Sequence, residues 1–441
     1  MTVIAAQAHA EKRLFISLLT RDISLADAFL DLLDNSINAA VKATGLQEGN
    51  AADYVALLTT EAKPRFTIQI DFDDSKVAIS DDCGGISAED ASTKVFVFGA
   101  EDESHLDDRL SVYGIGLKRA MFKLGNQIDM ESQHPKGGFK LDLSVKDWQA
   151  LKVTPWTFQI ESLAAVEQGK GRTNLTVTEL HPAVQARLQN PVFETELVTR
   201  IGRAYSFFIS RIVTIKVNGT AVEREEARIS SNQASESFEL DGVSVAITAG
   251  LGTPTNGDRY ESEYAGWNVY CNGRAVIFYD RSPLTGWGVD GYLPSFQPKH
   301  RPFVGIVFFT SDDPEKLPWT TTKLGVNTDN IIWQRAVQRM ADVGRQVTRY
   351  LDSRYGEEGT TITMAELADA IGQGEEIKPT LKVTAVSFSP PKRKSSPLTT
   401  VQYKVDKKVL QAVKDAIGTP SMSNGDAGIY TFEYFTENEV H

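Results

Sequence analysis

A carboxylate and an amide, Asp31 and Asn35, lie four residues apart in the segment 31–39. On a helix this spacing places both side chains on one face, so that they would share a site. An amide oxygen can ligate a hydrated Mg²⁺, and a neighbouring carboxylate can activate water for in-line attack on a phosphoryl group. The pair therefore indicates phosphoryl chemistry. The ordinary alternative for such a face is a set of acidic side chains in contact with solvent.

The helix that must carry this pair is predicted from its own residues. Ser24 can cap it, Asp27 follows three residues later as in a capping box, and apolar residues then recur on one face. The polar residues gather on the opposite face, with no Lys or Arg among them. They are Asp27, Asp31, Asp34, Asn35 and Asn38. Such a stripe suits a hydrated cation.

Two neighbouring strands are predicted at 66–72 and 76–80, and the second leads into a loop that contains Asp81, Gly85 and Ile86. A carboxylate followed by glycines at the end of a strand can form a ligand-binding loop. The same residue types also make ordinary turns.

Gly114 and Gly116 precede a short amphipathic helix, predicted at 117–124. Backbone N–H groups and the positive end of that helix would face an anion, which predicts a phosphate site. The spacing of the glycines matches neither the Walker nor the dinucleotide pattern. Further on, Thr173 offers a hydroxyl at the start of a predicted strand, 174–180.

In this order, the four segments resemble the GHKL ATPase superfamily, which includes gyrase, the heat-shock-90 chaperones, histidine kinases, MutL and MORC proteins. The resemblance covers roughly residues 15–345 and is closest to the MutL- and MORC-like members and their bacterial relatives. It implies an α+β fold: a two-layer α/β sandwich of the Bergerat ATP-binding type, a ribosomal-protein-like α/β transducer domain and a small C-terminal unit. The implied boundaries are 1–185 for the ATP-binding domain, 186–355 for the transducer-like domain, 356–400 for a partly basic linker and 401–441 for a helix and strand unit.

The resemblance also implies a role for individual residues, with ATP and Mg²⁺ as cofactors. Asp31 would be the general base, Asn35 the Mg²⁺ ligand and Asp81 the acceptor of the adenine amino group, while Thr173 would support the adenine-side network. Lys323, in a polar loop before a long helix, would reach the γ-phosphate. Apart from the resemblance, a lysine in such a loop is usually a solvated surface charge. The other residues implied at the nucleotide are Asp34, Asn38, Gly85, Ile86, Gly99, Tyr113, Gly114, Ile115, Gly116, Leu117 and Lys118.

Two residues depart from the family pattern. Many members have Glu where this chain has Asp31, and a side chain shorter by one methylene places the base farther from the attacking water, so slow turnover is expected. Cys83 stands where the family's loop has its first glycine, which changes the loop backbone.

Beyond the first domain, Asn218 and Gly219 form a strong hairpin signal. The other elements predicted there are a helix at 193–210, strands at 243–248, 267–270, 275–279 and 305–310, and a long helix at 329–355. The turn 270–274 looks like the Asn-Gly-Arg turn of MutL-like transducer domains, and it is equally an ordinary hairpin turn.

The composition is that of an ordinary globular protein, with 41% hydrophobic and 24% charged residues among 441. Two cysteines are too few for a disulfide framework or a structural zinc site, which favours a reducing compartment. No apolar run approaches the ~20 residues of a membrane helix, and the N-terminus lacks a signal core. We therefore expect a cytoplasmic protein without membrane contact.

The net charge of −12 argues against a general affinity for nucleic acid. The segment 378–414 is the exception, because it contains nine Lys or Arg residues and one acid, Asp406. It would bind DNA or an acidic effector protein, or serve only as a solvated tether. The aromatic residues at 430–435 should be covered by this chain, a twin subunit or another protein.

On the basis of the sequence we consider three functions. The first is a slow ATPase acting as a clamp that dimerises on ATP binding, in DNA-related or phage-defence processes. The second is a nucleotide-responsive interaction module that scarcely hydrolyses ATP and recruits an effector protein. The third, a histidine kinase, needs a phosphate-accepting His on a dimerising helix, and His9 has too little helix around it.

Overall fold

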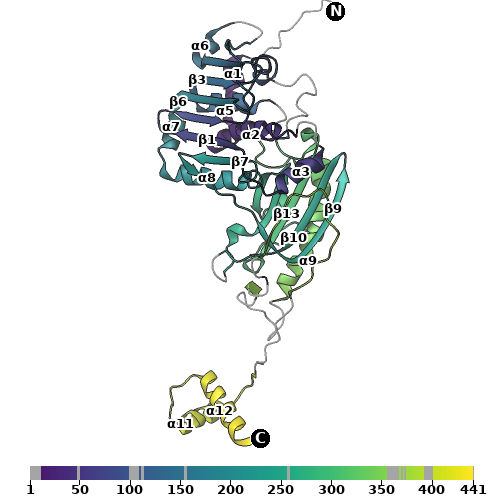
Figure 1. The fold of residues 1–441 in the computed structure, drawn as a ribbon. Helices are drawn as coiled ribbons and strands as arrows, with labels where there is room; N and C mark the ends of the chain where they lie inside the picture. The colour runs from purple at the N-terminus through teal and green to yellow at the C-terminus, as the bar shows by residue number, and fades with distance from the viewer. Residues whose placement is uncertain are drawn as a thin grey trace, which may run out of the picture. The chain divides into compact units, whose positions relative to one another are not determined.

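The computed structural model describes residues 11–46, 50–98, 109–110, 114–152, 156–255, 259–354, 367–368, 371, 374–391 and 401–440. The chain divides into two compact units, Met1–Lys392 and Arg393–His441. The first unit contains two β-sheets and the helices that cover them (Figure 1). This mixture of helices and largely antiparallel sheets agrees with the predicted α+β class.

Among the described residues, eight strands form the first sheet in the order β5-β4-β3-β6-β2-β1-β7-β8. All neighbours are antiparallel except β1 and β7, which are parallel. The strands are β1 Phe66–Phe72, β2 Val77–Asp81, β3 Gly125–Gln133, β4 Gly138–Ser144, β5 Ile160–Leu163, β6 Arg172–Leu180, β7 Val213–Val217 and β8 Thr220–Ala221. The hairpin predicted at Asn218 and Gly219 is confirmed as β7 and β8.

Helices α1, α2 and α5 lie on one face of this sheet (Figure 1). The predicted capping box of α2 is confirmed: the hydroxyl of Ser24 accepts the Asp27 N–H at 3.2 Å, and the Asp27 carboxylate accepts the Ser24 N–H at 2.9 Å. The helices of this part of the chain are α1 Lys12–Arg21, α2 Leu25–Ala43, α3 Ala51–Thr59, α4 Ala88–Asp90, the π-helix Ala91–Val95, α5 Gly116–Leu124, α6 Val145–Ala150, α7 Pro182–Leu188 and α8 Pro191–Ala204.

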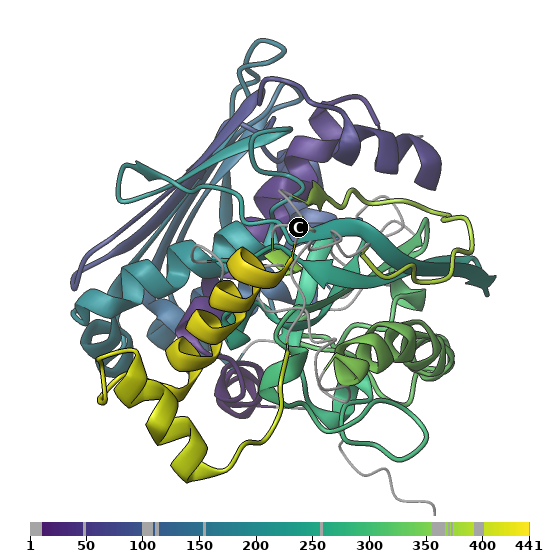
Figure 2. The ribbon, with the colours of Figure 1, turned by 90° about the horizontal axis from the view of Figure 1, so that it is seen from below.

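The second sheet has the strand order β12-β11-β13-β10-β9-β14 within the described residues. Its strands are β9 Arg228–Leu240, β10 Val243–Gly252, β11 Gly266–Cys271, β12 Arg274–Asp280, β13 Phe303–Ser311 and β14 Glu375–Glu376. The long predicted helix, α9 Ile331–Ser353, packs along β9 and β10 (Figure 2). The loop that carries Lys323 lies between β13 and α9, so its position depends on this second sheet.

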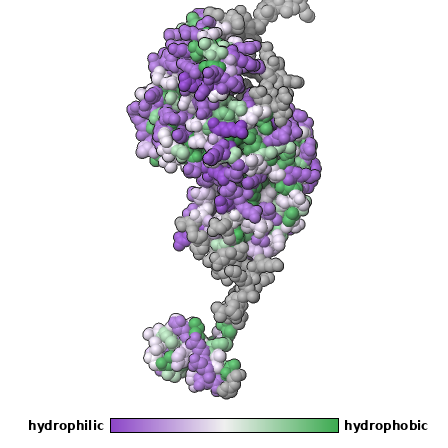
Figure 3. All heavy atoms as spheres, in the orientation of Figure 1, coloured by the Kyte–Doolittle hydropathy of each residue, from purple (hydrophilic) through white to green (hydrophobic). Residues whose placement is uncertain are grey.

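The second unit consists of α11 Lys407–Ala416 and α12 Asn424–Glu439. The strand predicted within the unit 401–441 is wrong for its described residues, because the aromatic residues at 430–435 lie inside α12. Ser423 caps that helix by accepting the Asp426 N–H at 3.0 Å. The aromatic side chains Tyr430, Phe432, Tyr434 and Phe435 are exposed, and Figure 3 shows apolar spheres on the surface of this unit.

None of the helices described in either unit combines the length and hydropathy that a bilayer crossing requires.

Candidate functional site

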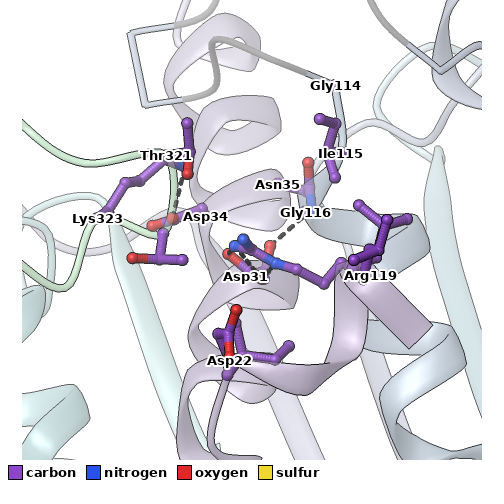
Figure 4. A pocket seen from close by; sticks show the side chains of 14 residues that line it. Asp22, Asp31, Asp34, Asn35, Gly114, Ile115, Gly116, Arg119, Thr321 and Lys323 are labelled. Carbon is purple, nitrogen blue, oxygen red and sulfur yellow. Dashed lines mark hydrogen bonds and ion pairs between the residues drawn. The ribbon is translucent and has the colours of Figure 1, made fainter. Parts of the chain in front are cut away.

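One cavity, between α2, the start of α5 and the loop before α9, collects many of the predicted site residues (Figure 4). It is lined by Leu18, Leu19, Asp22, Ile23, Asp31, Asp34, Asn35, Gly114, Ile115, Gly116, Arg119, Thr321, Thr322 and Lys323. Seven of these residues are predicted from the sequence, namely Asp31, Asp34, Asn35, Gly114, Ile115, Gly116 and Lys323. Three separate parts of the chain therefore meet at this cavity.

Asp31 lies on the buried side of α2 and is 3% exposed. Arg119, from α5, binds its carboxylate with two parallel hydrogen bonds, Nε to Oδ2 and Nη2 to Oδ1, each 2.8 Å long. Burial raises the pKa of Asp31 to about 6, against the opposing effect of the positive charges of Arg119 and Lys323. The carboxylate can therefore change its protonation near neutral pH.

Asn35 lines the same cavity one helical turn after Asp31. Its amide nitrogen donates to the backbone oxygen of Asp31 at 2.7 Å, which leaves Oδ1 without a donor among the described residues. A free amide oxygen fits Mg²⁺, which usually takes one or two protein ligands and completes its shell with water and phosphate oxygens. Within the described part of the chain, no group of three or more His, Cys, Asp or Glu residues could hold a metal by itself.

Asp34 is 1% exposed and forms three short contacts with residues from distant parts of the chain. Oδ1 accepts from Arg274 Nε at 2.7 Å and from the Tyr205 hydroxyl at 2.7 Å, and Oδ2 accepts from Lys323 Nζ at 2.8 Å. Burial acts to raise the pKa of Asp34, but the charges of Arg274 and Lys323 outweigh it and hold this pKa below its ordinary value. Asp34 therefore stays ionised and joins α2 to the second sheet.

The acidic residues of α2 are predicted to lie apart from any cationic side chain, or else to face solvent. In the folded protein they do neither, because they are buried and paired with cations. Asp27 pairs with Arg200 of α8, Asp31 with Arg119 of α5, and Asp34 with two cations of the second sheet and its loop. Because these cations lie far from α2 in the sequence, the helix itself gives no sign of them.

Gly116, the first residue of α5, lies beside Asp31. A Cβ on Gly116 would lie 3.4–3.5 Å from the side chain of Asp31, so the helix begins against that carboxylate. Lys118, in contrast, does not line the cavity. Its ammonium donates to the backbone oxygens of Val95 and Val97, at 2.7 and 2.6 Å, and burial lowers its pKa to about 8. Leu117 packs on the hydrophobic core.

The predicted adenine-side residues form a second group, which α2 connects to the cavity. The hydroxyl of Ser36, next to Asn35, donates to Asp81 Oδ2 at 2.8 Å, and Oδ1 accepts the backbone N–H of Cys83 at 3.0 Å. Burial raises the pKa of Asp81, while these two hydrogen bonds lower it. The carboxylate of Asp81 is thus fixed in orientation at the end of β2.

Thr173 lies opposite Asp81 in the register of β2 and β6. Its hydroxyl is 3.0 Å from that of Ser132, which also accepts the backbone N–H of Ile86 at 2.7 Å. Gly85 has φ +72, and a Cβ there would lie 1.9 Å from the backbone oxygen of Gln133. Only glycine allows this close approach of the loop to β3.

One described residue of the prediction, Asn38, makes a different contact. Asn38 accepts the backbone N–H of Leu110 at 3.0 Å and does not line the cavity, so it positions a neighbouring segment. Gly99 and Tyr113 lie outside the described residues.

Sequence reasoning missed Arg119, Ser36, Ser132, Arg274 and Tyr205. One of them had a usable signal: Arg119 stands in the first turn of α5, where the helix dipole disfavours a cation unless an anion lies close by. Arg274 stands in the turn noted at 270–274, but nothing in that turn points to Asp34. The two serines and Tyr205 offered no signal.

Comparison with known families agrees with this geometry. Residues 23–171 match the model of the family described as histidine kinase-, DNA gyrase B- and HSP90-like ATPase. This part of the chain is therefore a GHKL-type ATPase domain, and the match supports ATP binding there. No curated protein matches the chain.

Proposed function

We propose that the protein is a Mg²⁺-dependent ATPase that works as a nucleotide-gated dimeric clamp. The observation that supports it is the meeting of Asp31, Asn35, Gly116 and Lys323 around one cavity. A nucleotide whose triphosphate entered there would contact α2, the start of α5 and the loop of the second sheet together. Such positioning and charge stabilisation account for most of the catalysis in phosphoryl transfer.

Each residue has a separate task in this proposal. Asn35 would hold Mg²⁺, which neutralises charge on the phosphate oxygens when it is bound. The backbone N–H groups at Gly114 and Gly116 bind phosphate at the positive end of α5. Asp31 takes a proton from the attacking water, and Lys323 stabilises the charge on the γ-phosphoryl group.

The adenine would bind beside Asp81, whose carboxylate accepts its amino group. We expect Asp81→Asn to lower ATP affinity about 10- to 100-fold, because a hydrogen bond to a charged group is lost. Titration calorimetry with ATP measures this. Asp82→Asn is the matched control, since the Asp82 side chain accepts the Thr67 N–H instead. Equal affinities for the wild type and Asp81→Asn would contradict the assignment.

Residues 186–355 serve as a transducer domain of the kind found in MutL- and MORC-like proteins in this proposal. The support is the contact of Arg274 and Lys323 with Asp34, because these residues link the second sheet to the nucleotide helix. ATP would draw Lys323 toward the γ-phosphate, and hydrolysis would release it. The cycle would then move one sheet relative to the other.

For Lys323→Ala, we expect nearly unchanged nucleotide binding and a turnover lower by about 100-fold, as for the loss of one donor to a transition-state anion. Lys316→Ala is the control, because Lys316 lies in the same interval before α9 and pairs with exposed Asp241. Steady-state ATP hydrolysis and nucleotide titration measure both variants. A wild-type rate in Lys323→Ala would exclude it from the mechanism.

The target of the clamp would be found in DNA-related or phage-defence processes, with the basic segment 378–414 as the contact to DNA or to an effector protein. Sedimentation of the full chain with ATP, ADP and a non-hydrolysable analogue tests the proposal, with turnover followed on the same samples and repeated with DNA. Dimers that form with ATP and dissociate on hydrolysis support a clamp. A monomer under all conditions contradicts it.

One observation favours a second function, a nucleotide-responsive module that binds ATP and scarcely hydrolyses it. Both carboxylate oxygens of Asp31 are bound by Arg119, which competes with the role of a base. The exposed aromatic side chains of α12 would then recruit an effector. Tight ATP binding with negligible turnover would favour this function.

A further inference from the structure

Arg119 occupies a position that is unfavourable for a cation by itself. It lies in the first turn of α5, where the helix dipole is positive, and its side chain is 8% exposed. A buried guanidinium at such a place needs a fixed anion. Asp31 supplies that anion from α2, and it is the acidic side chain that Arg119 binds among the described residues.

The contact fixes the orientation of the carboxylate as well as its charge. Two parallel hydrogen bonds form the planar fork that arginine makes with a carboxylate, and lysine cannot reproduce it. On its other side, the Asp31 side chain touches Gly116 and opens to the cavity (Figure 4). The start of α5, which would bind phosphate, and the orientation of Asp31 are therefore linked through one side chain.

The charged side chains that line the cavity with Asp31 come from four elements. They are Arg119 on α5, Lys323 in the loop before α9, Asp34 on α2 itself and Asp22 at the end of α1. Lys323 binds Asp34 at 2.8 Å, and Asp34 also pairs with Arg274, so Lys323 acts on Asp31 through its charge. Among the described residues, Arg119 is the cation in direct contact with Asp31.

We propose that Arg119 is a positioning residue for the base: its two parallel hydrogen bonds direct the carboxylate of Asp31 to the phosphate end of the cavity. The inference rests on the proposed ATPase function. In this proposal, Arg119 fixes the orientation of Asp31, which is one methylene shorter than the Glu of many family members. Because Arg119 belongs to α5, the orientation of Asp31 depends on the position of that helix.

The first test separates turnover from ATP affinity in Arg119→Met. Without the fork, the carboxylate of Asp31 loses its fixed orientation, and a misplaced group in the site can cost about 100-fold in rate. We therefore expect kcat to fall about 10- to 100-fold, while ATP affinity in titration calorimetry stays close to that of the wild type. An affinity that falls as far as kcat would mean that Arg119 binds the nucleotide itself, and it would overturn the positioning role.

Two further variants separate positioning from structural damage. Arg119→Lys keeps the charge without the fork, so it should restore kcat only in part. Arg200→Met is the matched control, since Arg200 pairs with Asp27 on the same helix and does not line this cavity. Its kcat should equal that of the wild type.

The second test needs no nucleotide. Arg119→Met leaves the buried carboxylate of Asp31 without its two hydrogen bonds, and an uncompensated buried charge is strongly destabilising. The melting temperature of Arg119→Met should therefore lie below that of the wild type. The double variant Asp31→Asn/Arg119→Met has no unpaired carboxylate, and it should melt above Arg119→Met.

The outcomes distinguish this inference from the proposed function. A wild type that neither binds nor hydrolyses ATP ends the proposed function, and the melting comparison still decides whether Arg119 compensates Asp31. A wild type that hydrolyses ATP, with an unchanged kcat in Arg119→Met, overturns the positioning role. A double variant that melts no higher than Arg119→Met does so as well.

Discussion

Asp31→Asn should keep nucleotide binding and abolish measurable ATP hydrolysis. The substitution preserves the shape of the side chain but removes the group that accepts the proton of the attacking water. A positioned general base contributes about 10²–10⁴-fold to such a reaction, and a slow enzyme would lose its detectable turnover. Titration with ATP and a phosphate-release assay on the same preparation measure the two properties separately.

Asp27→Asn is the matched control for this experiment. Asp27 lies on the same helix, is 5% exposed and also pairs with an arginine, but it does not line the cavity. Its turnover should therefore remain close to that of the wild type. If Asp31→Asn hydrolyses ATP at the normal rate, Asp31 is not the base. If both variants lose activity equally, the loss reflects damage to α2.

The parts of the fold that the sequence predicted are those determined by local chemistry. The capping box of Ser24 and Asp27 and the turn at Asn218 and Gly219 need only neighbouring residues, and both were confirmed. The C-terminal segment shows the opposite case. Its aromatic residues favour a strand by composition, yet the cap at Ser423 starts a helix that continues through them.

The same division applies to the candidate site. The spacing of Asp31 and Asn35 could be recognised because four residues make one helical turn. The partners of the carboxylates could not, because Arg119 is 88 residues from Asp31, and Tyr205 and Arg274 are 171 and 240 residues from Asp34. The sequence therefore shows the acidic residue but does not show which distant cation pairs with it after folding. The orientation and protonation of the base are therefore properties of the tertiary structure.

Asp34→Ala should strongly lower the stability of the folded protein. This substitution removes the shared anion of two cations, Arg274, whose side chain is 1% exposed, and Lys323, whose side chain is 10% exposed. Breaking a buried pair on one side leaves an uncompensated charge and costs about 3–5 kcal/mol. Urea unfolding of the full chain, followed by tryptophan fluorescence, should show an early transition. Glu196→Ala, which removes one partner of the exposed pair with Arg187, should change stability by less than about 1 kcal/mol.

The pH dependence of Asp34→Ala identifies the cause of its loss. The pKa of Asp34 is held below its ordinary value in the folded protein, so its contribution is present above the unfolded pKa of about 3.9 and decreases as pH falls toward the folded value. The difference between the wild type and Asp34→Ala should therefore be full at pH 7 and smaller in acid. A difference that does not change with pH would mean that packing, and not charge, explains the loss. In that case Asp34 would not be the electrostatic link between the nucleotide helix and the second sheet.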